Sequence, residues 1–482
     1  MITTHSARRL PAVEPTTRSV AAIIVATILA SAVNTTVAST QASDSAASAF
    51  RATLRPLPLR EVLDSVRRHH PLVEAARARV RAARGSRTTA GTLGNPMLAF
   101  QVENAPLPGH APPAMDREAM TTAMLPLEPL YQRRTRVRRA DAELRAAEAD
   151  AAVASQRVAL DAAHAYYRTA LLQVGVDVAR DLSAWLDTVV AYNRSRVEEG
   201  VAAEADLMRS ELERDRAGAD ASMQEADLAR ARAELAAFLG AFPSGAAVDR
   251  QARRVEIEDV PLAMPATLGA AENRPSQSSS IARAELMDRA LLERPQLRAA
   301  RERLTATAAS VATERAMLFR QLGAMVGTKQ SAGTTSLIAG VSVPLPLFDQ
   351  NRGEVARATA DREAAMLELA AEERAARAEI AGASEAARLL TARATMLAMA
   401  SSGAGPAYLK RADEARRIAL GAYREGAVPL LSVIDAARTW GDARLAYYRT
   451  IFAQHESILA LLAAEGAELA TALDELPAGA RR

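Results

Sequence analysis

Val341–Glu354 reads VSVPLPLFDQNRGE, and within it a strand pattern gives way to a helix pattern. From Leu337 onward, apolar residues fall on every second position, which is the period of a strand with one apolar face. Pro344 and Pro346 end this pattern, because proline cannot donate a backbone hydrogen bond to a sheet. Ala, Glu, Arg and Leu then dominate a stretch without proline that lasts until Pro406. The sequence therefore predicts a short strand that leads into a very long helix.

The first half of the chain repeats this order. Met97–Val102 alternates between apolar and polar residues, and a loop rich in Pro and Gly leads to a second, weaker strand pattern at Ala119–Leu125. Pro126 and Pro129 close the strand, and a second long stretch without proline follows. Each half therefore predicts one β-hairpin followed by a long helix.

Further matches extend the repeat on both sides. Leu59 to about Arg87 predicts a helix with Pro71 in its early part, and PLVEAAR from Pro71 resembles PQLRAAR from Pro295. A Glu-Gly pair ends each long helix, at Gly200 and at Gly426, and a returning helix is expected after each. This shared order of elements predicts an internal duplication.

The predicted returning helices are Asp206–Leu239 and Leu431 to about Leu473. In the first long helix, six positions seven residues apart predict a coiled-coil seam: Val137, Leu144, Ala151, Val158, Ala165 and Leu172. In the second, Ala358, Leu369 and Ile380 are eleven residues apart, which favours a different supercoil. The superhelix geometry stays open.

These patterns divide the chain into five segments. We expect a signal peptide and N-terminal segment at 1–42, a first repeat at 43–240 with its hairpin at 97–126, a linker at 241–281, a second repeat at 282–473 with its hairpin at 318–344, and a tail at 474–482. The helical tips are expected near 200 and 426. A loop near 401–406 is expected to interrupt the second long helix.

Composition excludes several classes of protein. The 60 basic and 57 acidic residues give a net charge of +3 and are interleaved, which argues against nucleic-acid binding. The absence of cysteine excludes disulfides, thiol catalysis and a lipid-modified N-terminal cysteine. Arginines followed by an apolar run at 20–33 are typical of a secretory signal, with an uncleaved anchor as the alternative. Cleavage after Ala32, Ala38 or Ala42 stays open.

The two hairpins indicate a membrane role. They supply four strands, whereas a closed barrel needs about eight. Open sheet edges are not tolerated in lipid, so hairpins with one apolar face suggest a barrel built from several chains. The long helices would then lie on the water side of the membrane.

With these features together, and above all with PLPLFDQNRGE at Pro344–Glu354, the chain resembles the TolC-type outer-membrane efflux family, in its CzcC/CusC-like heavy-metal branch. The resemblance implies a mainly α fold with a small β part. Duplicated helical hairpins would form a periplasmic coiled-coil tunnel, and a homotrimer would form a 12-stranded outer-membrane barrel. It also implies a periplasmic adaptor and an inner-membrane pump of the resistance-nodulation-division class as partners. The chain would be a passive exit duct for heavy-metal cations or drugs in a Gram-negative outer membrane, with no cofactor and no catalysis.

The resemblance also implies roles for particular residues. The adaptor-docking tip would include Gly200, Val201, Asp206, Gly426 and Val428. The candidates for the channel constriction are Tyr423 and Asp435, and the barrel-to-helix joints would be Pro126, Pro129, Pro344, Pro346 and Phe348. Ser432 and Val428 depart from the acid and the arginine of some members, so a closed-state network must differ here.

Plainer interpretations stand beside these. Asp206 and Asp435 fit solvated acids near helix starts, and Tyr423 fits packing between helices. Met115, Met120 and Met124 suit an apolar barrel surface as well as a soft-metal site, so no metal site is predicted. A periplasmic coiled-coil scaffold or adaptor without a membrane barrel is the alternative function. We find no sequence pattern for a phosphate loop, a zinc protease or a hydrolase.

Overall fold

The computed structural model describes residues 56–105, 109, 115–239, 254–257, 262, 287–288, 290–318, 322–399 and 406–475. All of them belong to one compact unit, Arg55–Arg482. The predicted signal segment, most of the predicted linker, residues 400–405 and the end of the predicted tail lie outside the described residues.

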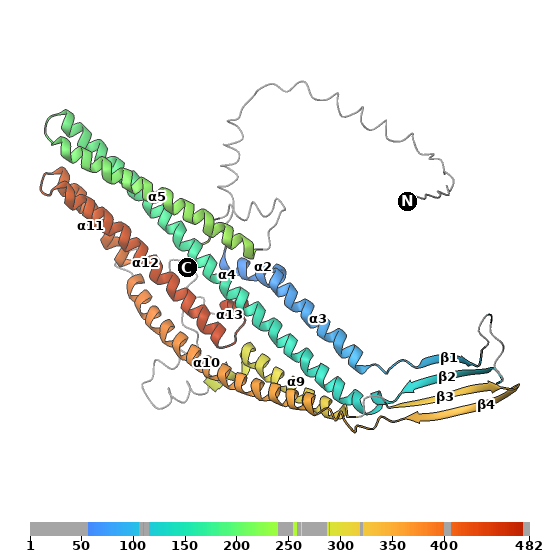
Figure 1. Ribbon diagram of the computed structural model, residues 1–482. Helices are drawn as coiled ribbons and strands as arrows, with labels where there is room; N and C mark the ends of the chain where they lie inside the picture. Colours follow the sequence, from blue (N-terminus) through green and yellow to red (C-terminus); the bar gives the residue numbers. More distant parts are fainter. Residues whose placement is uncertain are drawn as a thin grey trace, which may run out of the picture. The chain divides into compact units, whose positions relative to one another are not determined.

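Both halves share one order of elements, a helix, two strands, a long helical segment and a returning helix, to which α2 and α13 are added (Figure 1). The first half contains α2 (Leu59–His69), α3 (Pro71–Gly91), β1 (Met97–Glu103), β2 (Glu118–Pro126), α4 (Glu128–Glu198) and α5 (Glu204–Phe238). The second contains α9 (Pro295–Ala316), β3 (Gly323–Ser331), β4 (Thr334–Ser342), α10 (Arg352–Ala398), α11 (Ala407–Arg424), α12 (Leu430–Ala464) and α13 (Leu469–Glu475). The predicted fold class, mainly α with duplicated helical hairpins and a small β part, is confirmed.

The four strands form one antiparallel sheet in the order β1-β2-β3-β4. Each hairpin pairs internally, and β2 pairs with β3, so the two halves of the chain meet in the centre of the sheet. Within the described residues, β1 and β4 each pair on one side only and form the two edges. The sheet lies at one end of the helices and the two helical tips lie at the other (Figure 1).

Helix α4 is the element against which most others pack. It spans 71 residues, which corresponds to about 105 Å at 1.5 Å per residue. Helices α2, α3, α5, α9 and α12 all contact it, and Trp440, Tyr447 and Ile451 of α12 are among the most buried side chains. In α10 the buried residues are mostly alanines, at positions 358, 365, 376, 387 and 394. Such small side chains allow neighbouring helices to approach closely.

The predicted seven-residue seam does not form the core of this chain. Of its six positions only Val158 is buried, and the other five are half-buried. Helix α4 has neighbours on several sides, so its buried positions move around the helix axis along its length. One column of residues could not describe this.

Two helices predicted as continuous are interrupted. The predicted Leu59–Arg87 helix breaks at His70, whose backbone is extended with ψ at 129°. The ring of Pro71 clashes with a helical conformation of the residue before it, which explains the break. Pro71 instead begins α3, where its missing N–H is no loss. The predicted helix from Leu431 to Leu473 ends at Ala464, because Gly466 adopts the left-handed conformation at φ +87°.

Part of the predicted linker is bound to the core. Val255 is buried and forms a bridge with Leu57, and the hydroxyl of Tyr166 donates to the carbonyls of Leu57 and Glu256. Farther along, the side chain of Gln454 both accepts from the backbone N–H of Leu262 and donates to its carbonyl. These segments therefore form part of the packed unit.

We expect Gly466→Ala to destabilise the protein. Its left-handed backbone disfavours any side chain by about 1–2 kcal/mol, and an added Cβ would lie 3.0 Å from the Cα of Arg294. Chemical denaturation of the purified protein measures the effect as a lower midpoint.

The matched control is Gly382→Ala in the middle of α10, where an added Cβ meets no atom within 4 Å. Alanine is the better helix former by about 0.5–1 kcal/mol, so this variant should be slightly more stable than the parent. Equal midpoints for the two variants would contradict the role assigned to Gly466.

Candidate functional site

The two helical tips have the same backbone structure. At the first, the N–H of Gly200 donates to the carbonyl of Val197, and the N–H of Val201 donates to that of Arg196. At the second, Gly426 and Ala427 repeat the pattern with Tyr423 and Ala422. Both glycines are left-handed, with φ of +73° and +76°, as this helix-ending motif requires. Glycine thus fixes both tight turns at equivalent places in the repeat.

The tips differ in their side chains. Gly200, Val201 and Gly426 are exposed, whereas Val428 is half-buried against a small core around Leu430. The first tip therefore presents an apolar side chain to solvent. At the second tip, Val428 is instead partly covered by that core.

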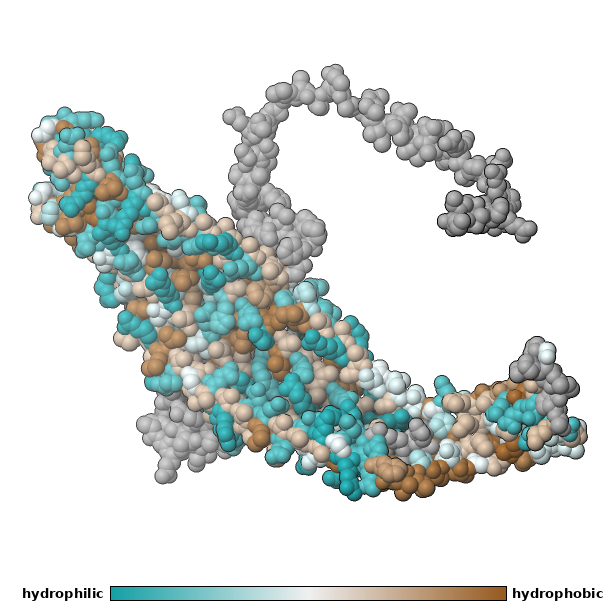
Figure 2. Space-filling view, in the orientation of Figure 1, coloured by the Kyte–Doolittle hydropathy of each residue, from teal (hydrophilic) through white to brown (hydrophobic). Residues whose placement is uncertain are grey.

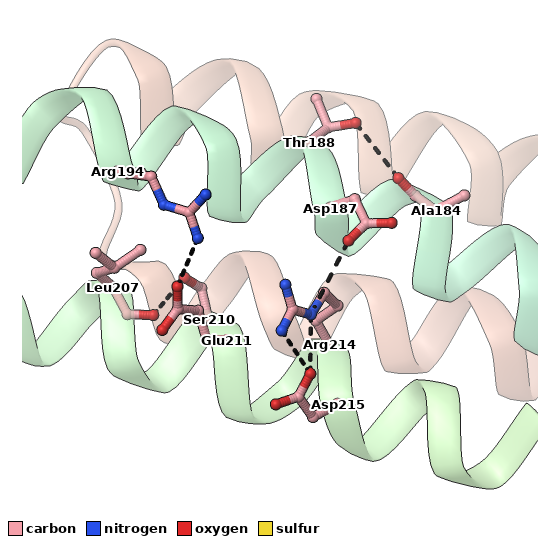
Figure 3. A network of polar contacts seen from close by, with 9 residues as sticks. All are labelled: Ala184, Asp187, Thr188, Arg194, Leu207, Ser210, Glu211, Arg214 and Asp215. Carbon is pink, nitrogen blue, oxygen red and sulfur yellow. Dashed lines mark hydrogen bonds and ion pairs between the residues drawn. The ribbon is translucent and has the colours of Figure 1, made fainter.

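Ion pairs connect the two helices of the first hairpin (Figure 3). Arg194 of α4 pairs with Glu211 of α5 at 2.8 Å, and Arg214 of α5 lies 2.6 Å from Asp215 and 4.0 Å from Asp187 of α4. These groups are exposed or half-exposed, so water and salt screen the pairs and they add little to the stability of the hairpin.

The second hairpin is held to α4 by aromatic and polar contacts that are buried. Tyr423 of α11 is buried, and its hydroxyl donates a 2.6 Å hydrogen bond to Oδ1 of Asn193 on α4. Its ring packs edge-on against Tyr192, with centroids 5.9 Å apart. Burial raises the pKa of the Tyr423 phenol, with the charge of Asp206 as the next cause. The phenol is therefore protonated at neutral pH and acts as the donor.

The two predicted acids are not brought together. Asp206 lies in the first turn of α5, half-buried, and its charge acts on Tyr423. Asp435 is exposed on α12. Neither carboxylate forms a hydrogen bond or ion pair with another residue in the described part of the chain, which fits the solvated acids considered from sequence.

Several contacts at this end were not predicted. Asn193 is fully buried, and its Nδ2 has no hydrogen-bond partner among the described residues. Farther from the tip, the guanidinium carbons of Arg416 and Arg444 lie 3.9 and 4.9 Å from the ring centroid of Trp440, whose indole N–H donates to Asp413 at 2.5 Å. Asn193 could have been found as a polar residue on an otherwise apolar face of the helix. No pattern in the sequence indicates that Arg416 and Arg444 stack on Trp440.

The sheet has two unlike faces. Residues opposite one another in antiparallel strands share a face, so the register assigns Leu98, Phe100, Leu125, Val326, Leu337 and Val341 to one face. All six are exposed, and we call this the apolar face. The other, which we call the polar face, carries Gln101, Glu103 and an ion pair between Glu118 and Lys329 at 2.5 Å. Hydrophobic surface accordingly gathers over the strands in Figure 2.

The joints lie where the sequence predicted proline exits. Pro126 is the last residue of β2, and Pro129 is in the first turn of α4. Pro344 and Pro346 follow β4 without regular structure, and Phe348 is 100% exposed. Asn351, which was not predicted, anchors the second joint: it is buried with φ at +56°, and its Nδ2 donates to the carbonyl of Glu314 at 2.7 Å.

The methionine interpretation needs a correction. Met120 and Met124 lie on the polar face, opposite Lys329 and Met325, and so do not belong to the apolar surface expected from sequence. Met115 precedes β2 and is exposed. The spacing of the methionines suits a strand, but spacing alone does not say which face of a sheet meets lipid.

No three His, Cys, Asp or Glu side chains lie close enough together among the described residues to hold a metal ion. His70 stacks on Phe238, and its Nδ1 accepts from the N–H of Leu72 at 3.3 Å, which gives it a structural role at the start of α3. None of the described helices is both long enough and apolar enough to cross a membrane.

Comparisons with known proteins agree with this architecture. The outer membrane efflux protein family matches residues 62–241 and 286–467, one stretch in each half. The cobalt-zinc-cadmium resistance protein CzcC of Cupriavidus metallidurans is 27% identical over 165 residues, which are 34% of this chain and 38% of that relative. The match thus spans well under half the length of the curated relative.

Two solved structures have the same fold. The outer-membrane channel OprN superposes with a TM-score of 0.67 at 21% identity, covering 86% of this chain and 90% of OprN. The outer membrane protein VceC of Vibrio cholerae superposes with a TM-score of 0.66 at 20% identity, covering 85% of this chain and 96% of VceC. The fold, the duplicated match and the two-faced sheet agree, and the chain belongs to the outer membrane efflux protein family.

Proposed function

We propose that this chain is the outer-membrane channel of a tripartite efflux system, a passive exit duct for heavy-metal cations or drugs. An inner-membrane pump of the resistance-nodulation-division class would deliver the cargo through a periplasmic adaptor. The observation that carries the proposal is the sheet, which has one exposed apolar face and two open edges and continues into helices up to 71 residues long. Its family consists of efflux proteins, and a duct of this kind performs no catalysis.

Closure of the sheet requires more than one copy. Four strands fall short of the roughly eight that close a barrel, whereas three copies would supply twelve. In such a homotrimer, β4 of each copy pairs with β1 of the next, and every edge N–H and C=O in the lipid finds a partner. The apolar face would then meet lipid and the polar face would line the duct.

The cargo is proposed from the relatives. CzcC is named for resistance to cobalt, zinc and cadmium, which favours heavy-metal cations. OprN and VceC are named only as an outer-membrane channel and an outer membrane protein, so drugs stay within the proposal. Export would place a signal peptide and N-terminal segment within residues 1–42, and without cysteine the mature protein would not be a lipoprotein.

The tips are proposed to meet the adaptor. Gly200, Val201 and Gly426 are exposed there, with Asp206 and Val428 close behind them. Tyr423 and Asp435 would act at the channel constriction. The support for Tyr423 is its hydrogen bond to Asn193, which ties the second hairpin to α4 in the structure described here.

Fractionation of cells that express the protein, followed by gel electrophoresis without boiling, tests the proposed function. A heat-labile trimer in the outer membrane would support it. A soluble periplasmic monomer or dimer would contradict it and favour a coiled-coil scaffold.

Phe100→Arg should prevent assembly in the outer membrane, because Phe100 lies exposed on the apolar face. An arginine facing lipid costs about 2–4 kcal/mol at the bilayer midplane. The matched control is Gln101→Arg, one residue further on and on the polar face. The amount of trimer in the outer membrane should fall strongly for the first variant and little for the second, and equal loss would argue against a lipid-facing sheet.

Tyr423→Phe should loosen the second tip. It removes the donor to Asn193 and leaves a buried acceptor without a partner, which costs about 1–3 kcal/mol. Single-channel recordings should then show higher conductance or more frequent opening than in the parent protein.

Tyr192→Phe is the control, because the Tyr192 hydroxyl donates to the carbonyl of Arg424, on the exposed side of the tip, at 3.3 Å. Its recordings should resemble those of the parent. If Tyr423→Phe also leaves the conductance unchanged, Tyr423 serves packing alone and the proposed role in the constriction is wrong.

A further inference from the structure

Three methionines stand side by side on the polar face of the sheet. The register pairs Met97 of β1 with Met124 of β2, and Met124 with Met325 of β3. They come from three strands and from both halves of the chain, and all three are at least 36% exposed. We call these three residues the methionine row.

The row lies on the face that carries all the charged side chains of the strands, namely Glu103 and the ion pair of Glu118 with Lys329. Met120 and Ile338 share this face, but the charged groups make it the side of the sheet that suits water. Met97 is 63% exposed, and Met124 and Met325 are each 36% exposed. Packing in a core therefore does not account for three exposed thioethers on this face.

The row has room to rearrange. Its neighbour on β4 is Gly340, and a Cβ there would lie 3.2 Å from the Cε methyl of Met325. The side chain of Met325 thus extends over the space that the glycine leaves open. Because a methionine side chain has three rotatable bonds and no branch, Met325 can turn from Gly340 toward Met124.

The spacing allows the sulfur atoms to converge. Residues directly opposite one another in antiparallel strands have Cβ atoms about 4.5–5.5 Å apart. Met124 stands between the other two, so its sulfur can meet that of Met97 or Met325, or both, at a common point in front of the sheet. Thioethers are soft, uncharged ligands that favour Cu(I) over hard cations and over divalent metals that prefer oxygen or nitrogen.

We propose that the methionine row is a binding site for soft monovalent cations, Cu(I) or Ag⁺, on the inner wall of the duct. The proposal rests on the proposed function for the statement that the polar face lines the duct. The row lies near the end of the sheet where β2 passes into α4, so a cation leaving the helical part meets it on entering the sheet. Neutral ligands hold a cation weakly enough to release it, as passage through a channel requires.

The chemistry of the row also predicts what it rejects. No carboxylate or imidazole belongs to the row, and the nearest ion pair on the face, Glu118 with Lys329, is already matched. Zn²⁺ and Co²⁺ should therefore bind there poorly. This selectivity differs from the metals for which the relative CzcC is named.

Equilibrium dialysis of Ag⁺ against the purified full-length protein tests the proposal. The parent should bind Ag⁺ at a site that the triple variant Met97→Leu, Met124→Leu, Met325→Leu lacks, because leucine has a similar volume and no sulfur. The control triple variant, Met208→Leu, Met223→Leu, Met366→Leu, removes three exposed methionines from α5 and α10 and should bind like the parent.

Methionine-methyl ¹³C NMR of the parent gives a second readout that needs no folded variant. Ag⁺ should shift three methyl resonances together, and Zn²⁺ should leave them in place. Retention of Ag⁺ binding by the first triple variant, equal loss in the control, or an absence of shifted resonances would overturn the proposal. Failure of the parent to form a trimer would instead count against the proposed function, since binding is read separately.

Discussion

The two open edges of the four-stranded sheet govern the rest of this structure. Each edge presents backbone N–H and C=O groups that water can satisfy and lipid cannot, at a cost of several kcal/mol for each unpaired group. Exposure of the apolar face to water is also unfavourable, because of the hydrophobic effect. In the proposed trimer, pairing of edge with edge between copies would meet both demands. The helices, which continue directly from the strands through Pro126 and Pro344, would then follow the same symmetry.

Duplication gives the chain two equivalent tips that share a backbone and differ in chemistry. The glycine turns at Gly200 and Gly426 are closed by the same pair of hydrogen bonds. Exposed ion pairs join α4 and α5 near the first tip, whereas the buried Tyr423 holds the second hairpin to α4. The exposed ion pairs can be replaced by ion pairs with a partner protein at little cost in free energy. Breaking the buried hydrogen bond between Tyr423 and Asn193 costs more, because it leaves a buried polar group without a partner. Under the proposed function, this difference would suit the first tip to docking and the second to holding the channel in one state.

In the sequence, the positions of proline and glycine gave the most reliable predictions of where strands and helices end. Such residues act through the local backbone, so the joints, the tips and the duplication could be predicted. Gly466 closes a turn of the same local kind, with φ at +87°, and was missed; its close contact with Arg294, far away in sequence, is a second demand for glycine that no local pattern shows. Asn193 could not be predicted as the partner of Tyr423 for the same reason, since their contact depends on how two hairpins pack. The methionine row could not be found from spacing, because it exists only through the register of three strands.

Cysteine cross-linking can detect pairing of β1 with β4 between copies, since the sequence contains no native cysteine that would compete. Gln101→Cys would be combined, one at a time, with cysteine substitutions at the positions of β4 that lie on the same face of the sheet. A disulfide requires Cα atoms about 4.4–6.8 Å apart, so only the position opposite Gln101 in the neighbouring copy should form one. If β1 and β4 pair between copies, one of these combinations should give a disulfide-linked trimer in the outer membrane that resists boiling without reductant. Monomers at every position would contradict it.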